Sequence, residues 1–284
     1  MESQRHHAKS FSFEFFPPKS AEAAAILKNT LKKLAPLKPQ FFSVTYGAGG
    51  STRDHTFETV MEIQHETGIG AAPHLSCIGS TQNNIREVLA KYRAHGIKRI
   101  VALRGDMPSG MQDAGELHYA NELVSFIRQE SGDHFHIEIA AYPEVHPQAT
   151  NALTDFKNFK KKVDAGANSA LTQYFYNPQA YFHFVASCEQ AGINMPIVPG
   201  IMPISNYTQL ARFSDACGAE IPRWIRKRLE AYGDDMASIR AFGLDITTEL
   251  CTILLEQGAP GLHFYTMNKA EATLSIWKRL GLNT

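Results

Sequence analysis

A glutamate in the middle of an aromatic run is the residue of this chain best suited to chemistry. The run reads Phe-Ser-Phe-Glu-Phe-Phe-Pro-Pro over residues 11–18; it alternates like a strand and ends in two prolines. We therefore expect Glu14 at or near the carboxyl end of a strand, between aromatic rings. Burial there raises the pKa of a carboxyl group, so we expect Glu14 to hold a proton near neutral pH and to act as a general acid. The alternative is a carboxylate that faces solvent from the polar side of a half-buried strand.

Other polar side chains follow the predicted strands. Arg104 offers a planar fork for a phosphate or carboxylate, and Asp106 is able to hydrogen-bond a nitrogen-rich heterocycle, although both also suit a polar loop. Gln173 is an amide in an otherwise apolar and aromatic strand. It suits a carboxamide or a pterin ring, with a purely structural glutamine as the alternative.

A rigid turn and a charged helix follow the fifth predicted strand. The turn, residues 142–147, holds an aromatic, an acid and an imidazole between prolines. The next helix carries Asp155, Asn158, Lys161 and Lys162 at spacings that allow them to share a face. Such a face is able to clamp a diphosphate, and the alternative is an ordinary solvated surface.

Eight short strand-like runs alternate with longer amphipathic stretches, which predicts the elements that position these residues. The predicted strands are residues 12–16, 41–45, 72–77, 99–104, 136–141, 169–174, 197–200 and 261–265. The predicted helices are residues 21–34, 52–67, 82–95, 116–129, 149–165, 178–190, 207–217, 236–256 and 269–280, with an extra short helix at 221–233.

Eight strand–helix units in 284 residues favour an α/β fold, a (β/α)8 TIM barrel with an extra helix before the last unit, over an open doubly wound sheet. We expect one catalytic domain over residues 1–284, with residues 1–10 disordered or frayed. In such a barrel the carboxyl ends of all strands meet at one mouth, where the polar residues named above would gather.

Composition narrows the possible partners. The 28 basic and 28 acidic residues balance, so no overall field favours nucleic acid or an anionic membrane. We expect no membrane span and no signal peptide, hence a cytoplasmic protein. Four scattered cysteines and twelve histidines form neither a Cys-x-x-Cys nor a His-Glu-x-x-His motif, so no metal is expected.

Seven segments at successive strand ends together resemble the bacterial 5,10-methylenetetrahydrofolate reductases. They are residues 11–18, 43–48, 72–75, 103–106, 141–147, 172–173 and 199–203. The resemblance runs in order along nearly the whole chain. It implies a barrel with non-covalent FAD, which NADH or NADPH reduces and 5,10-methylenetetrahydrofolate reoxidises by ping-pong kinetics, giving 5-methyltetrahydrofolate.

The resemblance also implies roles for individual residues. Glu14 looks like the general acid, Asp106 like the carboxylate near flavin and pterin, and Gln173 like the amide that contacts both substrates. The implied cofactor-binding residues are Thr45, Tyr46, Ala48, His74, Arg104, Gly105, Asp106, Tyr119, Ala120, Tyr142, His146, Ala149, Asp155, Asn158, Lys161 and Lys162. The implied substrate-binding residues are Glu14, Thr45, Asp106, Gln173, Tyr181, Phe213 and Lys269.

One departure from the family and two alternatives qualify this interpretation. Lys269 stands where the family can carry an arginine, so its contact with the folate glutamate would be a point charge instead of a fork. Family likeness also suggests a homo-oligomer. The alternatives are a cofactor-free barrel lyase, although no lysine lies in a predicted strand at the mouth, and a non-catalytic barrel that binds flavin or folate.

Overall fold

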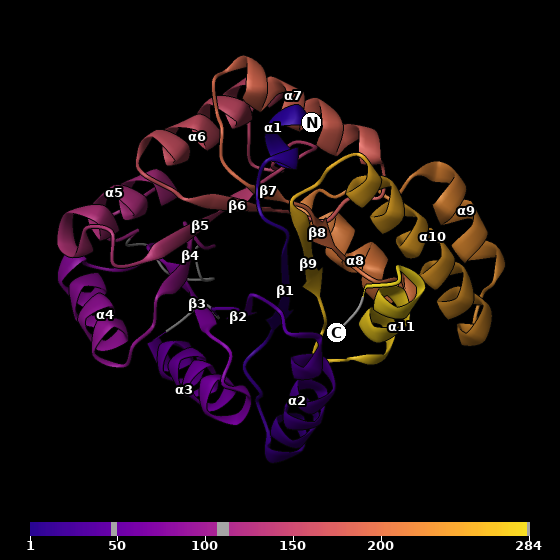
Figure 1. Ribbon diagram of the computed structural model, residues 1–284, viewed down its shortest axis with the longest axis horizontal. Coiled ribbons are helices and arrows are strands. Elements are labelled where there is room, and N and C mark those ends of the chain that lie inside the picture. The colour runs from indigo at the N-terminus through magenta and orange to yellow at the C-terminus, as the bar shows by residue number, and fades with distance from the viewer. Residues whose placement is uncertain (47–49, 107–113, 283–284) are drawn as a thin grey trace.

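The strands form a barrel of parallel pairs surrounded by helices (Figure 1). The computed structural model describes residues 1–46, 50–106 and 114–282. The strands are β1 (Ser10–Phe15), β2 (Phe41–Val44), β3 (Ala71–Ser76), β4 (Arg99–Leu103), β5 (His136–Ala141), β6 (Ser169–Thr172), β7 (Ile197–Val198), β8 (Gly200–Ile201) and β9 (Gly261–Tyr265).

Helices follow the strands and cover the outside of the barrel. They are α1 (Glu2–Arg5), α2 (Ala21–Leu34), α3 (Gly50–Thr67), α4 (Gln82–Ala94), α5 (Ala120–Ser131), α6 (Ala152–Asp164), α7 (Pro178–Gln190), α8 (Tyr207–Cys217), α9 (Arg223–Ala231), α10 (Met236–Glu256) and α11 (Glu271–Arg279), with a 3-10 turn at Ala35–Leu37. The extra helix before the last unit is α9.

The sheet closes through one interrupted strand. Its order is β7-β6-β5-β4-β3-β2-β1-β9-β8, and β7 and β8 are the two halves of the predicted seventh strand. Pro199 separates them because it has no N–H to donate to the ladder. β7 pairs with β6 and β8 pairs with β9, and the Pro199 carbonyl accepts a hydrogen bond from His263 N at 2.9 Å. The (β/α)8 fold class is therefore confirmed.

Local sequence signals account for most of the element boundaries. The side chains of Ser20, Thr81 and Asn151 cap the helices that follow them. Gly218 ends α8 with a φ of 75°, a conformation that glycine adopts without strain. The predicted helix at 149–165 begins later, at Ala152, because the Asn151 cap fixes its first turn.

The prediction of a frayed terminus at residues 1–10 was wrong. Residues 2–5 form α1, and β1 already begins at Ser10. Gln4 is fully buried; its Nε2 donates to Met195 O at 3.1 Å, and its Oε1 accepts from Ile197 N at 2.8 Å. A polar side chain with both ends satisfied holds the segment against the start of β7, which the local sequence pattern did not reveal.

The alternation of β1 separates the hydrophobic core from the site. Phe13 and Phe15 face outward and are fully buried under the helices, and Trp277 of α11 packs on the Phe13 ring at 5.9 Å. Burial of each such ring stabilises the fold by about 1.5–3 kcal/mol. Ser12 and Glu14 face the opposite way, into the barrel. The aromatic run therefore buries Glu14 by anchoring its strand.

Among the helices of the described residues, none is long and apolar enough to cross a membrane.

Candidate active site

Glu14 lies at the centre of a buried polar cluster inside the barrel mouth. Its residue surface is 7% exposed, and its Oε2 atom lies 3.3 Å from His74 Nε2 and 3.4 Å from His263 Nε2. The second ring nitrogen of His263, Nδ1, is 2.7 Å from Ser12 Oγ. The prediction that Glu14 is a buried carboxyl near the end of its strand is confirmed, and the solvent-facing alternative is wrong.

The two imidazoles reverse the expected effect of burial on this carboxyl group. Burial alone raises the pKa of Glu14, but contacts with His263 and His74 outweigh it and lower the pKa from 4.5 to about 2. The pKa of Glu14 in this arrangement therefore shifts in the direction opposite to that expected from burial alone, and the general-acid role stays a prediction. The aromatic neighbours in sequence point away from the carboxyl group, and its neighbours in space are able to carry positive charge.

Strand register builds the cluster. In the parallel pairing of β1 with β9, Ser12 is opposite His263 and Glu14 is opposite Tyr265. The Glu14 carbonyl accepts a hydrogen bond from Thr266 Oγ1 at 2.6 Å, which ties the end of β1 to the end of β9. Sequence reasoning missed Ser12 and His263. The position of Ser12 could have been predicted from the sequence, because a residue two positions from Glu14 must share its face of the strand.

An aromatic and amide wall borders the cluster. Tyr265 donates its hydroxyl to Thr172 O at 2.8 Å, and Gln173 Oε1 accepts from Tyr174 N at 3.0 Å. The phenol of Tyr142 is hydrogen-bonded to Gln173, and burial raises the pKa of Tyr142 to about 12. The Tyr142 ring meets the His146 ring edge-on at 4.4 Å between centroids. Gln173 thus has a structural bond and also reaches the mouth, so both of its expected roles stay open.

The charged residues predicted after β4 and β5 come together only in part. Arg104 Nη2 donates to Gln148 Oε1 at 2.6 Å, and the Asp155 carboxylate accepts from His146 N at 2.9 Å. Lys162 Nζ donates to Ala140 O at 2.5 Å, and burial lowers the pKa of this lysine to about 8 despite the nearby Asp155.

Two of the four residues expected to share a face of α6 turn outward. Asn158 and Lys161 are exposed, and Lys161 Nζ lies 3.4 Å from Asn158 Oδ1. Asp155 and Lys162 are partly buried against the barrel. The outward pair resembles the solvated surface that was the alternative for this helix.

The remaining predicted residues differ in position. Thr45, Tyr46 and Gly105 follow strands at the mouth, His74 lies within β3, and Ala149 follows the turn after β5. Gly105 has a φ of 81°, and a Cβ there would lie 1.8 Å from Ser76 Oγ, so glycine is required. Tyr119 is largely exposed before α5, which begins at Ala120. Ala48 lies outside the described residues.

Tyr181 does not belong to the site. It is fully buried in α7, its ring stacks on Phe175 at 5.7 Å between centroids, and its hydroxyl donates to Ile197 O at 2.7 Å. A side chain that is wholly covered and hydrogen-bonded has no surface left for a ligand. The assignment of Tyr181 to substrate binding was therefore wrong.

Asp106 remains a prediction. Its side chain is 94% exposed, and its carboxylate lies 3.9 Å from Arg104 Nη2. The carboxylate also raises the pKa of the Tyr142 phenol, although burial is the larger cause of that shift. Asp106 is thus close to the mouth, on its solvent side.

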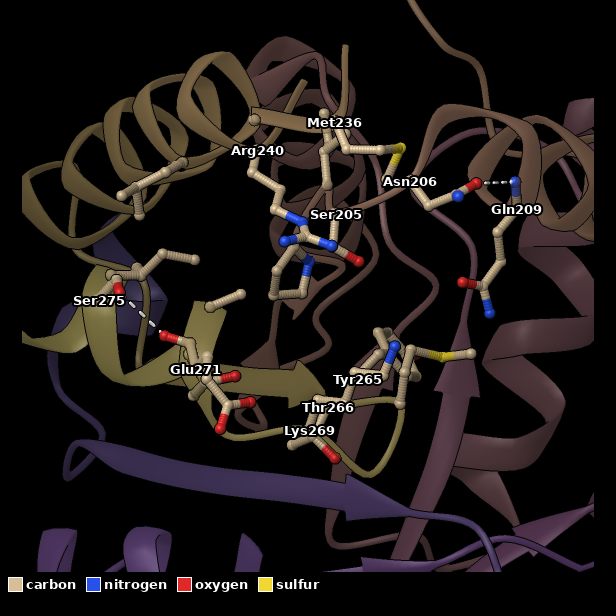
Figure 2. Close-up of a pocket in the computed structure, with 18 residues that line it drawn as sticks. Ser205, Asn206, Gln209, Met236, Arg240, Tyr265, Thr266, Lys269, Glu271 and Ser275 are labelled. Atoms are coloured by element: carbon tan, nitrogen blue, oxygen red, sulfur yellow. Dashed lines mark hydrogen bonds between the residues drawn. The ribbon is translucent and has the colours of Figure 1, made fainter. Parts of the chain in front are cut away.

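A cavity of about 430 Å³ opens beside the cluster, between α8, α10 and the segment that joins β9 to α11 (Figure 2). Tyr265 and Thr266 belong to its lining and also border Glu14, so the cavity lies next to the buried cluster. Figure 2 shows Arg240 extending from α10 towards the side that carries Tyr265 and Lys269. Glu271, also in the lining, is bound by Lys33 at 2.8 Å.

The cavity adds residues that the sequence analysis did not name. Gln209 and Asn206 line it beside Arg240, and the predicted Lys269 lies across from them. Phe213 is partly buried one turn beyond Gln209 on α8. No motif marks Arg240, because a single arginine on a helix has no distinguishing local pattern.

No cluster of three or more histidine, cysteine, aspartate or glutamate side chains is arranged to hold a metal ion in the part of the chain that the structure describes.

Comparisons with known proteins agree with the fold. A family model described as "Methylenetetrahydrofolate reductase" matches residues 1–281. The 5,10-methylenetetrahydrofolate reductase of Escherichia coli (strain K12) is 42% identical over 271 residues, covering 95% of this chain and 90% of that protein. The Arabidopsis thaliana methylenetetrahydrofolate reductase (NADH) 1 is 39% identical over 286 residues, covering 96% of this chain and 48% of that protein.

Solved structures show the fold alone. A Clostridium thermocellum protein described as binding two copies of 5-methyl-5,6,7,8-tetrahydrofolic acid has a TM-score of 0.67 at 17% identity, covering 97% of this chain and 95% of that one. A dihydropteroate synthase from Coxiella burnetii, in complex with pteroic acid, has a TM-score of 0.51 at 9% identity.

Proposed function

Because the chain belongs to the methylenetetrahydrofolate reductase family, we propose that it reduces 5,10-methylenetetrahydrofolate to 5-methyltetrahydrofolate. NADH or NADPH is the electron donor, non-covalent FAD is the carrier, and the two substrates react in turn by ping-pong kinetics. We include cytoplasmic location and a homo-oligomeric state in the proposal. The observation that carries it is a buried carboxyl, Glu14, at the barrel mouth beside a cavity lined by two cationic side chains.

The residues present fit a flavin dinucleotide. Arg104 and Lys162 are cations that both lie within electrostatic reach of His146 at one side of the mouth, and they suit a diphosphate. Gly105 lets the backbone after β4 pack directly on the Ser76 side chain and so shapes the rim of the mouth beside Arg104. His74 is buried at the mouth, where its Nε2 lies 3.3 Å from Glu14 Oε2. When bound, the flavin would supply hydride transfer.

Glu14 would deliver the proton that opens the five-membered ring of the folate. Both imidazoles contact its Oε2, and within the described ranges its Oε1 forms no hydrogen bond or ion pair. Oε1 is therefore the oxygen available to the substrate amine. Proton transfer from a positioned acid accelerates such steps by about 10²–10⁴-fold.

The cavity in Figure 2 suits the acidic end of the folate. Arg240 and Lys269 line it, and neither makes an ion pair within the described residues. Arg240 offers a planar fork to a carboxylate, and Lys269 adds a point charge. The 430 Å³ volume is within the range of small-molecule sites.

The decisive test is Glu14→Gln, studied one half-reaction at a time. We expect flavin binding and its reduction by NADH to stay within about twofold of wild type, because neither step needs the proton. Reoxidation by 5,10-methylenetetrahydrofolate should fall by about 10²–10⁴-fold, the usual contribution of a general acid. Stopped-flow absorbance of the flavin measures both halves in one preparation. Equal damage to both halves would refute the assignment of Glu14.

The same preparation tests the alternatives. A colourless protein that takes up no added FAD would defeat the flavin proposal, and a yellow protein without folate turnover would indicate a non-catalytic binding barrel. Lys162 has the lowered pKa of a Schiff-base lysine, but its Nζ is held by Ala140 O. Borohydride treatment with carbonyl substrates should therefore trap no adduct, and a trapped adduct at Lys162 would favour the lyase.

A further inference from the structure

We propose that Tyr174 is a positioning residue of the reaction. Its hydroxyl fastens the last turn of α8 to the end of β6 and so holds Gln209 and Phe213 at the barrel mouth. This inference rests on the proposed function and deepens it, because it names the group that places two residues of the substrate side. Tyr174 is 3% exposed and acts only through α8.

Helix α8 carries two neighbouring stripes of side chains. Gln209 and Phe213 are four positions apart and share one face, and Gln209 lines the cavity of Figure 2. Leu210 and Ser214 each lie one position further on, and both are buried. Because both stripes belong to one helix, the contacts of the buried stripe fix the direction in which Gln209 and Phe213 point.

The buried stripe of α8 packs into an apolar cluster that is separate from the main core of the barrel. Tyr174, Ile204, Leu210 and Ile239 belong to this cluster. Apolar packing has no preferred direction, so by itself it allows a helix to rotate and shift slightly. A hydrogen bond requires a particular distance and direction. A polar group within this contact is therefore able to set the rotation of α8.

The Tyr174 hydroxyl supplies that bond. It lies 3.0 Å from Ser214 Oγ and accepts a hydrogen bond from Cys217 Sγ at 3.5 Å. Since the thiol already donates to the phenol oxygen, the phenol proton is directed to Ser214 Oγ. Burial raises the pKa of Tyr174 above its ordinary value, so the phenol keeps this proton.

The Tyr174 ring is itself held in place. Its backbone N donates to Gln173 Oε1 at 3.0 Å. The rings of Tyr176 and Tyr265 meet it edge-on, with 6.0 and 6.2 Å between centroids. The Tyr265 hydroxyl in turn donates to Thr172 O at 2.8 Å. The phenol is thus a fixed point on the rim of the barrel.

Two other contacts hold the chain beyond α8 but not the helix face. The Glu144 carboxylate accepts a hydrogen bond from Glu220 N at 2.8 Å, and Gly218 packs against Pro147. Both contacts lie after Cys217, the last residue of α8. Neither involves a side chain of α8, so neither fixes its rotation. Within the described residues, the side-chain hydrogen bonds from α8 to the strand ends are those to Tyr174.

The expected consequence of losing the bond is weaker substrate binding with unchanged chemistry. Without the hydroxyl, α8 keeps its apolar contact but adopts several rotations, so Gln209 and Phe213 are in place for a smaller fraction of the time. The apparent Kd for the folate rises in inverse proportion to that fraction. Glu14 lies on β1 and does not depend on α8, so the limiting rate stays the same.

The test measures folate-dependent reoxidation of the reduced holoenzyme by anaerobic stopped flow over a range of 5,10-methylenetetrahydrofolate concentrations. Tyr174→Phe should raise the apparent Kd by about fivefold and leave the limiting rate within about twofold. Ser214→Ala removes the same bond from the other side and should do the same. Should one of the two variants fail to fold, the other carries the test.

Tyr181→Phe is the matched control. Tyr181 is fully buried, and its hydroxyl likewise forms a hydrogen bond, to Ile197 O at 2.7 Å, but it lies in α7 and is not bonded to α8. Urea denaturation should show a similar loss of stability in Tyr181→Phe and in Tyr174→Phe. The control should nevertheless keep the wild-type Kd for the folate within about twofold.

Double variants test whether Tyr174 acts through α8. Combining Tyr174→Phe with Ser214→Ala should raise the Kd no more than either single change, because both remove one bond. In a background that already carries Gln209→Ala and Phe213→Ala, Tyr174→Phe should change the Kd by less than about twofold, because the side chains that it positions are gone.

A second readout needs no turnover. Cys217 is partly exposed, whereas the other three cysteines are buried and burial raises the pKa of each of their thiols. Iodoacetamide should therefore react mainly at Cys217. Its alkylation rate, followed by mass spectrometry, reports how often the end of α8 leaves Tyr174. This rate should rise by about fivefold in Tyr174→Phe and stay at the wild-type value in Tyr181→Phe.

Three results would overturn the inference. A wild-type Kd in both Tyr174→Phe and Ser214→Ala refutes the positioning role while the proposed function stands. A rise of the Kd in Tyr181→Phe equal to that in Tyr174→Phe makes the effect a general consequence of lost stability. A lower limiting rate with an unchanged Kd assigns Tyr174 to the chemical step instead.

Failure of the proposed function gives a different result. A wild-type enzyme that never reacts with the folate refutes that function. The alkylation rates of Cys217 then still decide whether Tyr174 holds α8, because they require no substrate.

Discussion

Two buried carboxylates, Glu14 near the mouth and Glu138 towards the opposite end, lie in clusters of nearly the same composition. Each has a serine and histidine partners. Glu138 accepts a bond from Ser169 Oγ at 2.5 Å on Oε2, and its Oε1 contacts His136 and the guanidinium of Arg99. Glu14 has imidazoles on Oε2 alone, and its serine lies behind a histidine.

The two clusters differ in whether the partners are always charged and in whether both carboxylate oxygens have partners. Arg99 is charged at every working pH, and both oxygens of Glu138 have partners, so this cluster has one stable arrangement. The partners of Glu14 are imidazoles, which carry charge only when protonated, and among the described residues one of its oxygens has no hydrogen bond or ion pair. The same residue types thus make a structural ion pair at one end and a group suited to proton transfer at the other.

The largest expected effect is on the Glu138 cluster. Arg99→Met should lower the free energy of unfolding by about 3–5 kcal/mol, because a buried carboxylate is left without its cation. The double variant with Glu138→Met should recover most of that loss, since the orphaned charge is removed as well. Urea denaturation measures both. A loss below about 1 kcal/mol in the single variant would mean that this pair contributes no more to the free energy of unfolding than a surface ion pair does.

The next effect is on acid stability and concerns both carboxylates. Burial raises the pKa of each carboxyl group, but the partners of each lower it by more. The net shift of both pKa values is therefore downward, to about 2 for Glu14. Their stabilising contribution is therefore complete above the ordinary value of 4.5 and is lost as pH falls through the folded-state pKa.

Replacing either carboxyl by an amide should reduce the slope of unfolding free energy against pH in this acid range. The slope is proportional to the difference in the number of protons bound by the unfolded and the folded state. Each of Glu14→Gln and Glu138→Gln should reduce that difference by up to about one proton. Urea denaturation at several pH values gives the slope. An unchanged slope in Glu14→Gln would show that its imidazole partners do not hold it ionised.

The smallest effect separates the two serines. Ser169→Ala removes a bond to a carboxylate and should cost about 1.5–3 kcal/mol, whereas Ser12→Ala removes a bond to an imidazole and should cost about 0.5–1.5 kcal/mol. Urea midpoints with unchanged m values give both numbers. Equal costs would weaken the distinction between a structural and a functional cluster.

The sequence predicts those parts of the fold that local patterns encode. Pro178 at the first position of α7 and Gly218 after α8 mark helix ends by their own backbone preferences. The prediction of Glu14 worked for the same reason, since the alternation of β1 and its terminal prolines are local. Pro199 marks the break between β7 and β8 in the same local way, because proline has no N–H to donate to the ladder.

Contacts between residues far apart in the sequence could not be predicted from local patterns. Ser12 and His263 are 251 positions apart and meet only because the barrel closes. Without that pairing, the pKa of Glu14 was expected to move in the wrong direction. The assignment of Tyr181 to substrate binding was wrong for a similar reason. The family resemblance implied a ligand contact, whereas in the structure the Tyr181 ring packs against Phe175 in the core.

The short helix α1 bears on the order in which the molecule assembles. Gln4 bonds to residues 191 and 193 positions further along the chain. At a synthesis rate of about 5–20 residues per second, those partners emerge roughly 10–40 seconds after Gln4 does. Four residues form no stable helix by themselves. The docking of α1 is therefore a late step of biosynthesis, which latches the first segment of the nascent chain onto the seventh strand.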